Sequence, residues 1–242
     1  MKYFVSFSYD GSCFTGFQKQ KEHKTVQGEF EKYLSSLEGK PVELVASGRT
    51  DKGVHARGQC AHFCLDTNVT IYGLKKYLNR SFNGEIYVSN VTIVSDSFHA
   101  RYDVKDKIYS YYINMGEYNP MMRNYMYQYC EKLNINNMKK ASLCLIGEHD
   151  FRTFCTDSKD KENCVRSIYS IDFEENNNIL KITFKGNGFL RKMIRNIVAV
   201  LIEIGNDSRD ISDMKKLLDA KSRKGNLKCA FSGGLYLEKV NY

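Results

Sequence analysis

Hydrophobic residues in the first hundred positions recur with two spacings, one typical of strands and one typical of helices. Every second residue from Tyr3 to Tyr9 is apolar, which predicts a strand. A stripe from Val26 to Leu37 has helical spacing, with Thr25 as the expected N-cap and Gly39 as the expected stop. The pattern predicts a strand at 3–9, a helix at 26–37, strands at 42–46 and 59–65, a helix at 71–78 and a strand at 86–94.

The rest of the chain repeats this mixture. Lys107–Met115 alternates strongly and is strand-like, and Asp210 is the expected N-cap of a late helix. The pattern predicts a strand at 107–115, a helix at 138–146, strands at 165–173 and 179–184 joined by a turn at 174–178, helices at 189–204 and 211–218, and a strand at 235–240.

This order of elements predicts an α+β fold of two similar halves, each an antiparallel or mixed sheet with helices on one face. The chain of 242 residues has only 2 prolines and no Pro- or Ser-rich linker, so we expect the halves to pack directly. The expected boundary lies near 95–105, which gives an N-terminal half at 1–100 and a C-terminal half at 101–242.

Three features predict a soluble cytoplasmic protein. The N-terminus reaches Asp10 too soon for the apolar core of a signal peptide. The longest fully apolar run, Ile197–Ile202, is far too short to span a membrane. The 8 cysteines include no C-x-x-C pair, which favours free thiols in a reducing compartment.

Charge suggests a polyanion as partner. The formal net charge is +8, and lysines or arginines that meet phosphates release condensed counterions. Composition alone is equally consistent with a basic protein that binds no nucleic acid. The basic residues form three groups: Lys19, Lys21 and Lys24; Arg191, Lys192 and Arg195; and Lys221, Arg223, Lys224 and Lys228.

No metal site is predicted. Cys60, His62 and Cys64 share one face of an expected strand, but buried strand residues explain them better than zinc ligands, which usually pair across a tight turn. The zinc-deaminase signature is absent as well. A base deaminase is therefore disfavoured.

One loop places a carboxylate between two cations. Asp51 lies between Arg49 and Lys52, and Gly48 and Gly53 can act as hinges. Nearby positive charge keeps a carboxylate ionised. Such an aspartate is either a nucleophile or half of a surface ion pair, and the residues alone favour the surface pair, which is far commoner.

Two further residues could serve such a site. Arg195 lies on a helix that is apolar nearly all round, so its half-buried guanidinium needs an anion, and a structural carboxylate is the ordinary partner. Tyr109 belongs to a tyrosine-rich stretch, and tyrosines on sheets can stack on unpaired bases. A tyrosine in the strand core is the commoner explanation for Tyr109.

Taken together, motifs along the full chain resemble the tRNA pseudouridine synthase A (TruA) family. They are, in order, Tyr9-Asp10-Gly11, Gly16-Phe17-Gln18, Thr25-Val26-Gln27-Gly28, the loop from Gly48 to Ala56, Phe98-His99-Ala100-Arg101, the strand around Tyr109, Gly147-Glu148-His149-Asp150-Phe151, the helix Phe189–Val198 and Gly234-Leu235-Tyr236-Leu237. The loop with Gly-Arg-Thr-Asp is the most specific of them.

The resemblance implies an isomerase that converts uridine to pseudouridine in the anticodon arm of tRNA, at positions 38–40, after flipping the base and without cofactor or metal. It implies that Asp51 is the nucleophile and that Arg49 holds the site of the extruded base open. Tyr109 would stack on that base, and Arg195 would pair with Asp51. It also implies a homodimer, with the active cleft between the halves and one tRNA contacting both subunits.

This sequence departs from the family pattern at three places, none of them a proposed site residue. Lys52 stands where many bacterial members have alanine, Ala199 replaces a glycine, and no proline precedes the closing strand. The competing interpretation is an RNA-binding module without catalysis, which would not need Asp51, Tyr109 and Arg195 together.

Overall fold

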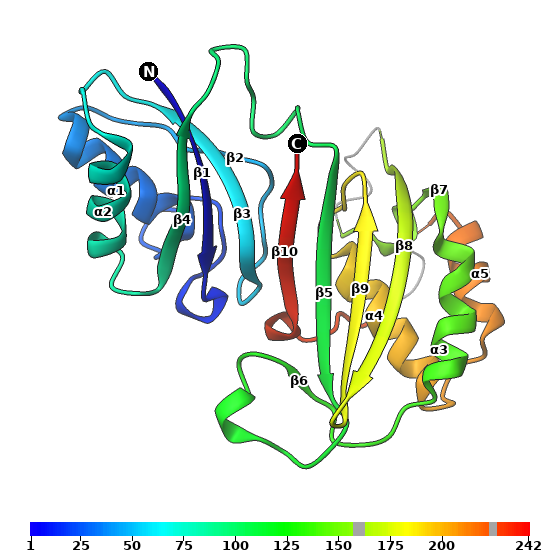
Figure 1. Ribbon diagram of the computed structural model, residues 1–242. Coiled ribbons are helices and arrows are strands. Elements are labelled where there is room, and N and C mark those ends of the chain that lie inside the picture. The colour runs from blue at the N-terminus through cyan, green and yellow to red at the C-terminus, as the bar shows by residue number, and fades with distance from the viewer. Residues whose placement is uncertain (157–162, 223–226) are drawn as a thin grey trace. The chain divides into compact units, whose positions relative to one another are not determined.

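The computed structural model describes residues 1–156, 163–222 and 227–242 (Figure 1). Its chain forms two compact units, Met1–Lys105 with Tyr236–Tyr242, and Asp106–Leu235. Both combine a sheet with helices, which confirms the α+β prediction. Arg223 and Lys224 of the third basic group lie outside the described residues.

Unit 1 combines a mixed sheet with two helices. Its elements are β1 Lys2–Tyr9, α1 Val26–Glu38, β2 Val45–Ala46, β3 His55–Cys64, α2 Ile71–Ser81, β4 Ile86–Ile93 and β10 Leu235–Asn241. The strand order is β4-β1-β3-β10, with β2 paired to β3. The β1 ladders to β3 and β4 are antiparallel, whereas β10 runs parallel to β3.

The core of unit 1 lies between this sheet and its two helices. The alternation in β1 buries Tyr3, Val5, Phe7 and Tyr9 on one face, as predicted. The Phe7 ring meets Phe30 of α1 at 4.6 Å between centroids. Figure 1 shows α1 and α2 together on one side of the strands.

The caps of α1 confirm its predicted limits. The Thr25 side chain accepts a hydrogen bond from the Gly28 N–H, and Gly39 ends the helix in the left-handed conformation with φ 76°. Other boundaries differ from the prediction. β3 begins at His55 rather than at residue 59, and β2 spans only Val45–Ala46 instead of 42–46.

Unit 2 combines a largely antiparallel sheet with three helices in its described part. Its elements are β5 Asp106–Asn114, β6 Tyr127–Gln128, α3 Ile135–Ser142, β7 Gly147–Asp150, β8 Val165–Asn176, β9 Ile179–Gly186, α4 Met193–Gly205 and α5 Ser212–Asp219. The strand order is β5-β9-β8-β7, with the short β6 parallel to β5. Helix α3 packs on α4 and α5, and Figure 1 shows the three helices gathered beside the strands.

The hairpin of β8 and β9 is tighter than predicted. Asn176 pairs with Ile179, so the turn consists of Asn177 and Asn178 and not of residues 174–178. Both turn residues have positive φ, 50° and 61°, which asparagine tolerates better than most residues. The polar residues before them continue β8 because an exposed strand accepts polar side chains.

The C-terminal strand β10 belongs to unit 1 and not to the C-terminal half in which the sequence pattern placed it. The predicted C-terminal half, 101–242, includes it, but the structure groups Tyr236–Tyr242 with unit 1. The reason is the parallel ladder between β10 and β3, in which Tyr236 pairs with His55 and Leu237 with Ala56. Such long-range pairing leaves no mark on the hydrophobic pattern.

Among the described residues, no helix is both long and apolar enough to cross a membrane. The chain segments that carry the candidate site residues lie in both units, with Asp51 and Arg49 in unit 1 and Tyr109 and Arg195 in unit 2.

Candidate active site

Asp51 lies in the loop that connects β2 to β3. Its side chain is half-buried, whereas Arg49 and Lys52 are exposed. Gly53 has φ 79°, a left-handed conformation that glycine adopts without strain, and the Val54 N–H donates to the Asp51 carbonyl over 3.2 Å. The predicted hinge is therefore confirmed at Gly53, which follows Asp51 closely in the loop.

The loop closes against the end of β1. The carbonyl oxygen of Val54 would lie only 2.1 Å from a Cβ atom on Gly11, so only glycine allows this approach. The Gly11 N–H donates to His55 Nδ1 over 3.0 Å. Because Nδ1 accepts this bond, its contact of 3.3 Å with the Asp10 carboxylate is no ion pair through that nitrogen. The turn Asp10-Gly11 thus supports the end of the Asp51 loop.

The middle of the loop is bonded to two other segments. The Tyr9 hydroxyl lies 2.8 Å from the Thr50 hydroxyl, and the Phe17 N–H donates to the Thr50 carbonyl over 3.1 Å. Burial raises the pKa of Tyr9 to about 12, although hydrogen bonds to Thr50 and Gln59 oppose the rise. The phenol therefore stays protonated even in mildly alkaline solution, in contact with the residue that precedes Asp51.

The start of the loop is held by Gln59 of β3. Its Oε1 accepts from the Ser47 hydroxyl over 2.7 Å, and its Nε2 donates to the Gly48 carbonyl over 3.2 Å. Gln59 pairs with Phe7 in the β1–β3 ladder, so it shares the buried face with Phe7 and Tyr9. The sequence pattern gave Gln59 no role beyond opening a strand.

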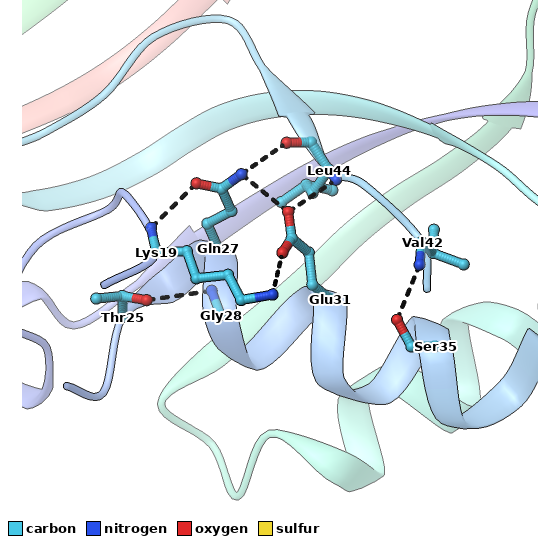
Figure 2. A network of polar contacts seen from close by, with 8 residues as sticks. All are labelled: Lys19, Thr25, Gln27, Gly28, Glu31, Ser35, Val42 and Leu44. Atoms are coloured by element: carbon cyan, nitrogen blue, oxygen red, sulfur yellow. Dashed lines mark hydrogen bonds and ion pairs between the residues drawn. The ribbon is translucent and has the colours of Figure 1, made fainter. Parts of the chain in front are cut away.

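A buried carboxylate ties together the segments on either side of helix α1 (Figure 2). Glu31, only 8% exposed, accepts from the Lys19 ammonium over 2.9 Å, from the Gln27 amide over 2.9 Å and from the Leu44 N–H over 3.2 Å. Gln27 also binds the Lys19 N–H and the Leu44 carbonyl. The network fixes the chain just before β2, and hence the approach to the Asp51 loop.

In unit 2, Tyr109 lies on β5 opposite Phe184 of β9. It is 9% exposed, and its ring meets Phe189 edge to face with centroids 5.3 Å apart. Aromatic pairs in this arrangement hold each other's orientation. Tyr109 is therefore largely buried on its strand, with its ring oriented by the segment that precedes α4, and its role at the site stays a prediction.

Arg195 lies in the first turn of α4, where it is half-buried as predicted. The helix is buried on nearly all sides. The Arg195 Nε donates to the Ala230 carbonyl over 2.8 Å, and the Ala230 N–H donates to the Arg195 carbonyl over 3.2 Å. A backbone carbonyl thus accepts a hydrogen bond from the Nε of Arg195, and this partner was not predicted from the sequence.

Within unit 2, Tyr111 links the strand that carries Tyr109 to the region around Arg195. Tyr111 follows Tyr109 on the same face of β5, and its hydroxyl donates to the Phe231 carbonyl over 2.8 Å. Burial raises the pKa of Tyr111 well above its usual range, and the positive charge of Arg195 opposes that rise. The pairing of Arg195 with Asp51, which belong to different units, stays a prediction.

Across residues 1–156, 163–222 and 227–242, no three histidine, cysteine, aspartate or glutamate side chains cluster as a metal site would require. Cys60 and His62 of β3 are buried, and His62 Nδ1 accepts from the Ala100 N–H over 3.1 Å. These residues are therefore part of the strand packing.

A profile of the tRNA pseudouridine synthase family matches residues 5–103 and 141–242. The chain belongs to the tRNA pseudouridine synthase family. It is 40% identical over 242 residues to a protein of Bacillus cereus named tRNA pseudouridine synthase A 2, covering 99% of each chain. It is 42% identical over 245 residues to tRNA pseudouridine synthase A of Streptococcus agalactiae (serotype Ia), covering 100% of this chain and 95% of that one.

Family membership confirms the resemblance predicted from the motifs. Asp51, Arg49 and Arg195 lie in the segments that the family profile matches, whereas Tyr109 lies between them. The two full-length relatives named above align across that gap.

Proposed function

We propose that this protein is an isomerase that converts uridine to pseudouridine in the anticodon arm of tRNA, at positions 38–40. The observation that carries the proposal is the Asp51 loop. In a chain of the tRNA pseudouridine synthase family, it presents a half-buried carboxylate on a backbone bonded at its start, middle and end.

The reaction rearranges bonds within one nucleoside. The bond from N1 to C1′ breaks, a bond from C5 to C1′ forms, the proton of C5 leaves and N1 gains a proton. Atoms and electrons balance, so the step requires neither oxidant nor reductant. Asp51 attacks an electron-poor carbon, either C1′ of the sugar or C6 of the base, and leaves once the new bond has formed.

Three further residues have proposed roles that rest on the family resemblance. Arg195 pairs with Asp51, which positions the carboxylate and keeps it ionised. Tyr109 stacks on the target base and exchanges a proton with it, and Arg49 holds open the site of the extruded base. Flipping the base costs a few kcal/mol of lost stacking, which the basic surroundings and Tyr109 offset.

The proposed partner, oligomeric state and cellular compartment also follow from the family resemblance. A net charge of +8 suits a tRNA partner, because each neutralised phosphate releases counterions. We propose a homodimer in which one tRNA contacts both subunits, acting in the cytoplasm. Sedimentation with and without tRNA tests the dimer.

The proposal is tested by mapping pseudouridine in unmodified tRNA after incubation with the purified protein. We expect pseudouridine only among positions 38, 39 and 40. Tight binding of the same tRNA without any pseudouridine would instead identify an RNA-binding module that lacks catalysis.

A further inference from the structure

The loop that carries Asp51 has no regular secondary structure, yet two buried polar side chains form hydrogen bonds with its residues. Tyr9 of β1 and Gln59 of β3 are 5% and 0% exposed. Both project from the buried face of the unit 1 sheet toward the loop. Neither side chain belongs to the proposed chemistry.

Their hydrogen bonds reach residues that flank Asp51 in sequence. Gln59 binds the Ser47 hydroxyl over 2.7 Å and the Gly48 carbonyl over 3.2 Å, and Tyr9 binds the Thr50 hydroxyl over 2.8 Å. The bonds therefore act on the backbone that aims the Asp51 side chain.

Burial raises the free-energy cost of losing one of these hydrogen bonds. Water cannot replace a lost partner of a fully buried group, so a hydroxyl left alone there costs more than one at the surface. A phenol is already protonated under physiological conditions, and burial raises the pKa of Tyr9 further, to about 12, so its hydroxyl stays able to donate. Thr50 is thereby held at its hydroxyl by Tyr9 and at its carbonyl by Phe17.

We propose that Tyr9, supported by Gln59, is a positioning residue that fixes Thr50 and so sets the direction of the Asp51 carboxylate. The inference rests on the proposed function, since it assigns Asp51 the catalytic role. It predicts that removing the phenol oxygen of Tyr9 slows the chemical step and leaves the affinity for tRNA nearly unchanged.

A matched pair of substitutions tests this prediction. Tyr3 and Tyr9 lie on the same buried face of β1, but the Tyr3 hydroxyl is directed to the Val69 carbonyl, at 3.4 Å, away from the loop. We expect Tyr9→Phe to lower kcat about tenfold or more while KM for tRNA stays within about twofold, because small misplacements of reacting groups are costly. Tyr3→Phe should keep kcat within about twofold.

Substitutions at Thr50 test the same bond from its other end. Thr50→Ser keeps the hydroxyl and should retain activity, whereas Thr50→Val removes it and should resemble Tyr9→Phe. The double variant Tyr9→Phe/Thr50→Val should be no slower than the worse single variant, because both remove one interaction. Additive losses in the double variant would overturn the inference.

Hydrogen exchange separates this inference from the proposed function. In Tyr9→Phe, amides of residues 48–53 should exchange faster than in the wild type, with no change in Tyr3→Phe. An active wild type with unchanged kcat in Tyr9→Phe would overturn the positioning role and leave the function standing. A wild type that forms no pseudouridine would overturn the proposed function. Unchanged hydrogen exchange at residues 48–53 in Tyr9→Phe would overturn the claim that Tyr9 holds the loop, whatever the activity.

Discussion

The hydroxyl of Tyr9 lies 2.8 Å from the hydroxyl of Thr50, so a phenol buried in β1 is bonded to the residue before Asp51. This bond joins the first strand of the chain to the loop with the most specific family motif. It also links the stability of unit 1 to the protonation of a tyrosine, with a consequence at alkaline pH.

Stability should fall above pH 10 partly because of Tyr9. Its pKa is raised from 10.0 to about 12, so its contribution is complete below pH 10 and is lost as the pH rises toward 12. The lost contribution is on the order of 3 kcal/mol, from two pKa units at about 1.4 kcal/mol each. Urea unfolding between pH 9 and pH 12 should therefore show the stability difference between wild type and Tyr9→Phe shrinking. A difference that stays constant with pH would contradict the assignment.

Glu31 should stabilise unit 1 far more than an exposed carboxylate does. Glu31→Ala leaves the Leu44 N–H and the Gln27 amide without their acceptor, and we expect a loss of about 2–4 kcal/mol in the free energy of unfolding. The control is Glu85→Ala, which breaks the more exposed pair with Lys24 and should cost about 1 kcal/mol or less. Equal losses in urea denaturation would show that burial of Glu31 has no special effect.

Tyr109→Phe should separate stacking from proton transfer. The ring and its edge-to-face contact with Phe189 remain, so the fold and tRNA binding should persist. Single-turnover formation of pseudouridine should slow by about 100-fold or more if the hydroxyl moves a proton. Tyr112→Phe, on the opposite face of β5, is the control and should retain activity. Retained turnover in Tyr109→Phe would reduce Tyr109 to a stacking platform.

Arg195→Leu should cost both stability and activity. It removes the bond from Nε to the Ala230 carbonyl, and in the proposed site it removes the partner of Asp51. We expect about 1–3 kcal/mol less stability by urea unfolding and a loss of pseudouridine formation. Arg195→Lys, which keeps the charge, should recover part of the activity. A stable and fully active Arg195→Leu protein would rule out the pairing with Asp51.

The sequence predicted those elements whose signals are local. Thr25 and Gly39 delimit α1 because capping depends on a side chain and a backbone conformation at single positions. Arg195 is half-buried as predicted because a helix apolar nearly all round has few exposed positions.

Boundaries set by long-range contacts could not be predicted in this way. β7, Gly147–Asp150, is polar and is a strand only because it pairs with β8. Helix α4 begins at Met193 and not at Phe189, because Lys192 adopts a left-handed conformation with φ 61° that no apolar spacing indicates.

The candidate site was predictable only in part, for the same reason. The loop motif identified Asp51. Tyr9 entered only as a strand residue and as part of the motif Tyr9-Asp10-Gly11, with no link to the loop, and Gln59 was assigned only to a strand. A polar residue such as Gln59 within a buried strand is the signal that could have identified it, because buried amides require partners. Which segment bonds to Gln59, here the loop at 47–50, is set by the tertiary structure and cannot be read from the sequence pattern.

The most direct test of Asp51 as the nucleophile is tritium release from tRNA labelled at C5 of uridine, compared between wild type and Asp51→Asn. The wild type should release tritium as pseudouridine forms. Asp51→Asn should release none while binding the tRNA within about tenfold of wild type, since the substitution changes one charge on a loop held by other residues. Tritium release by Asp51→Asn at the wild-type rate would contradict the assignment of Asp51 as the nucleophile.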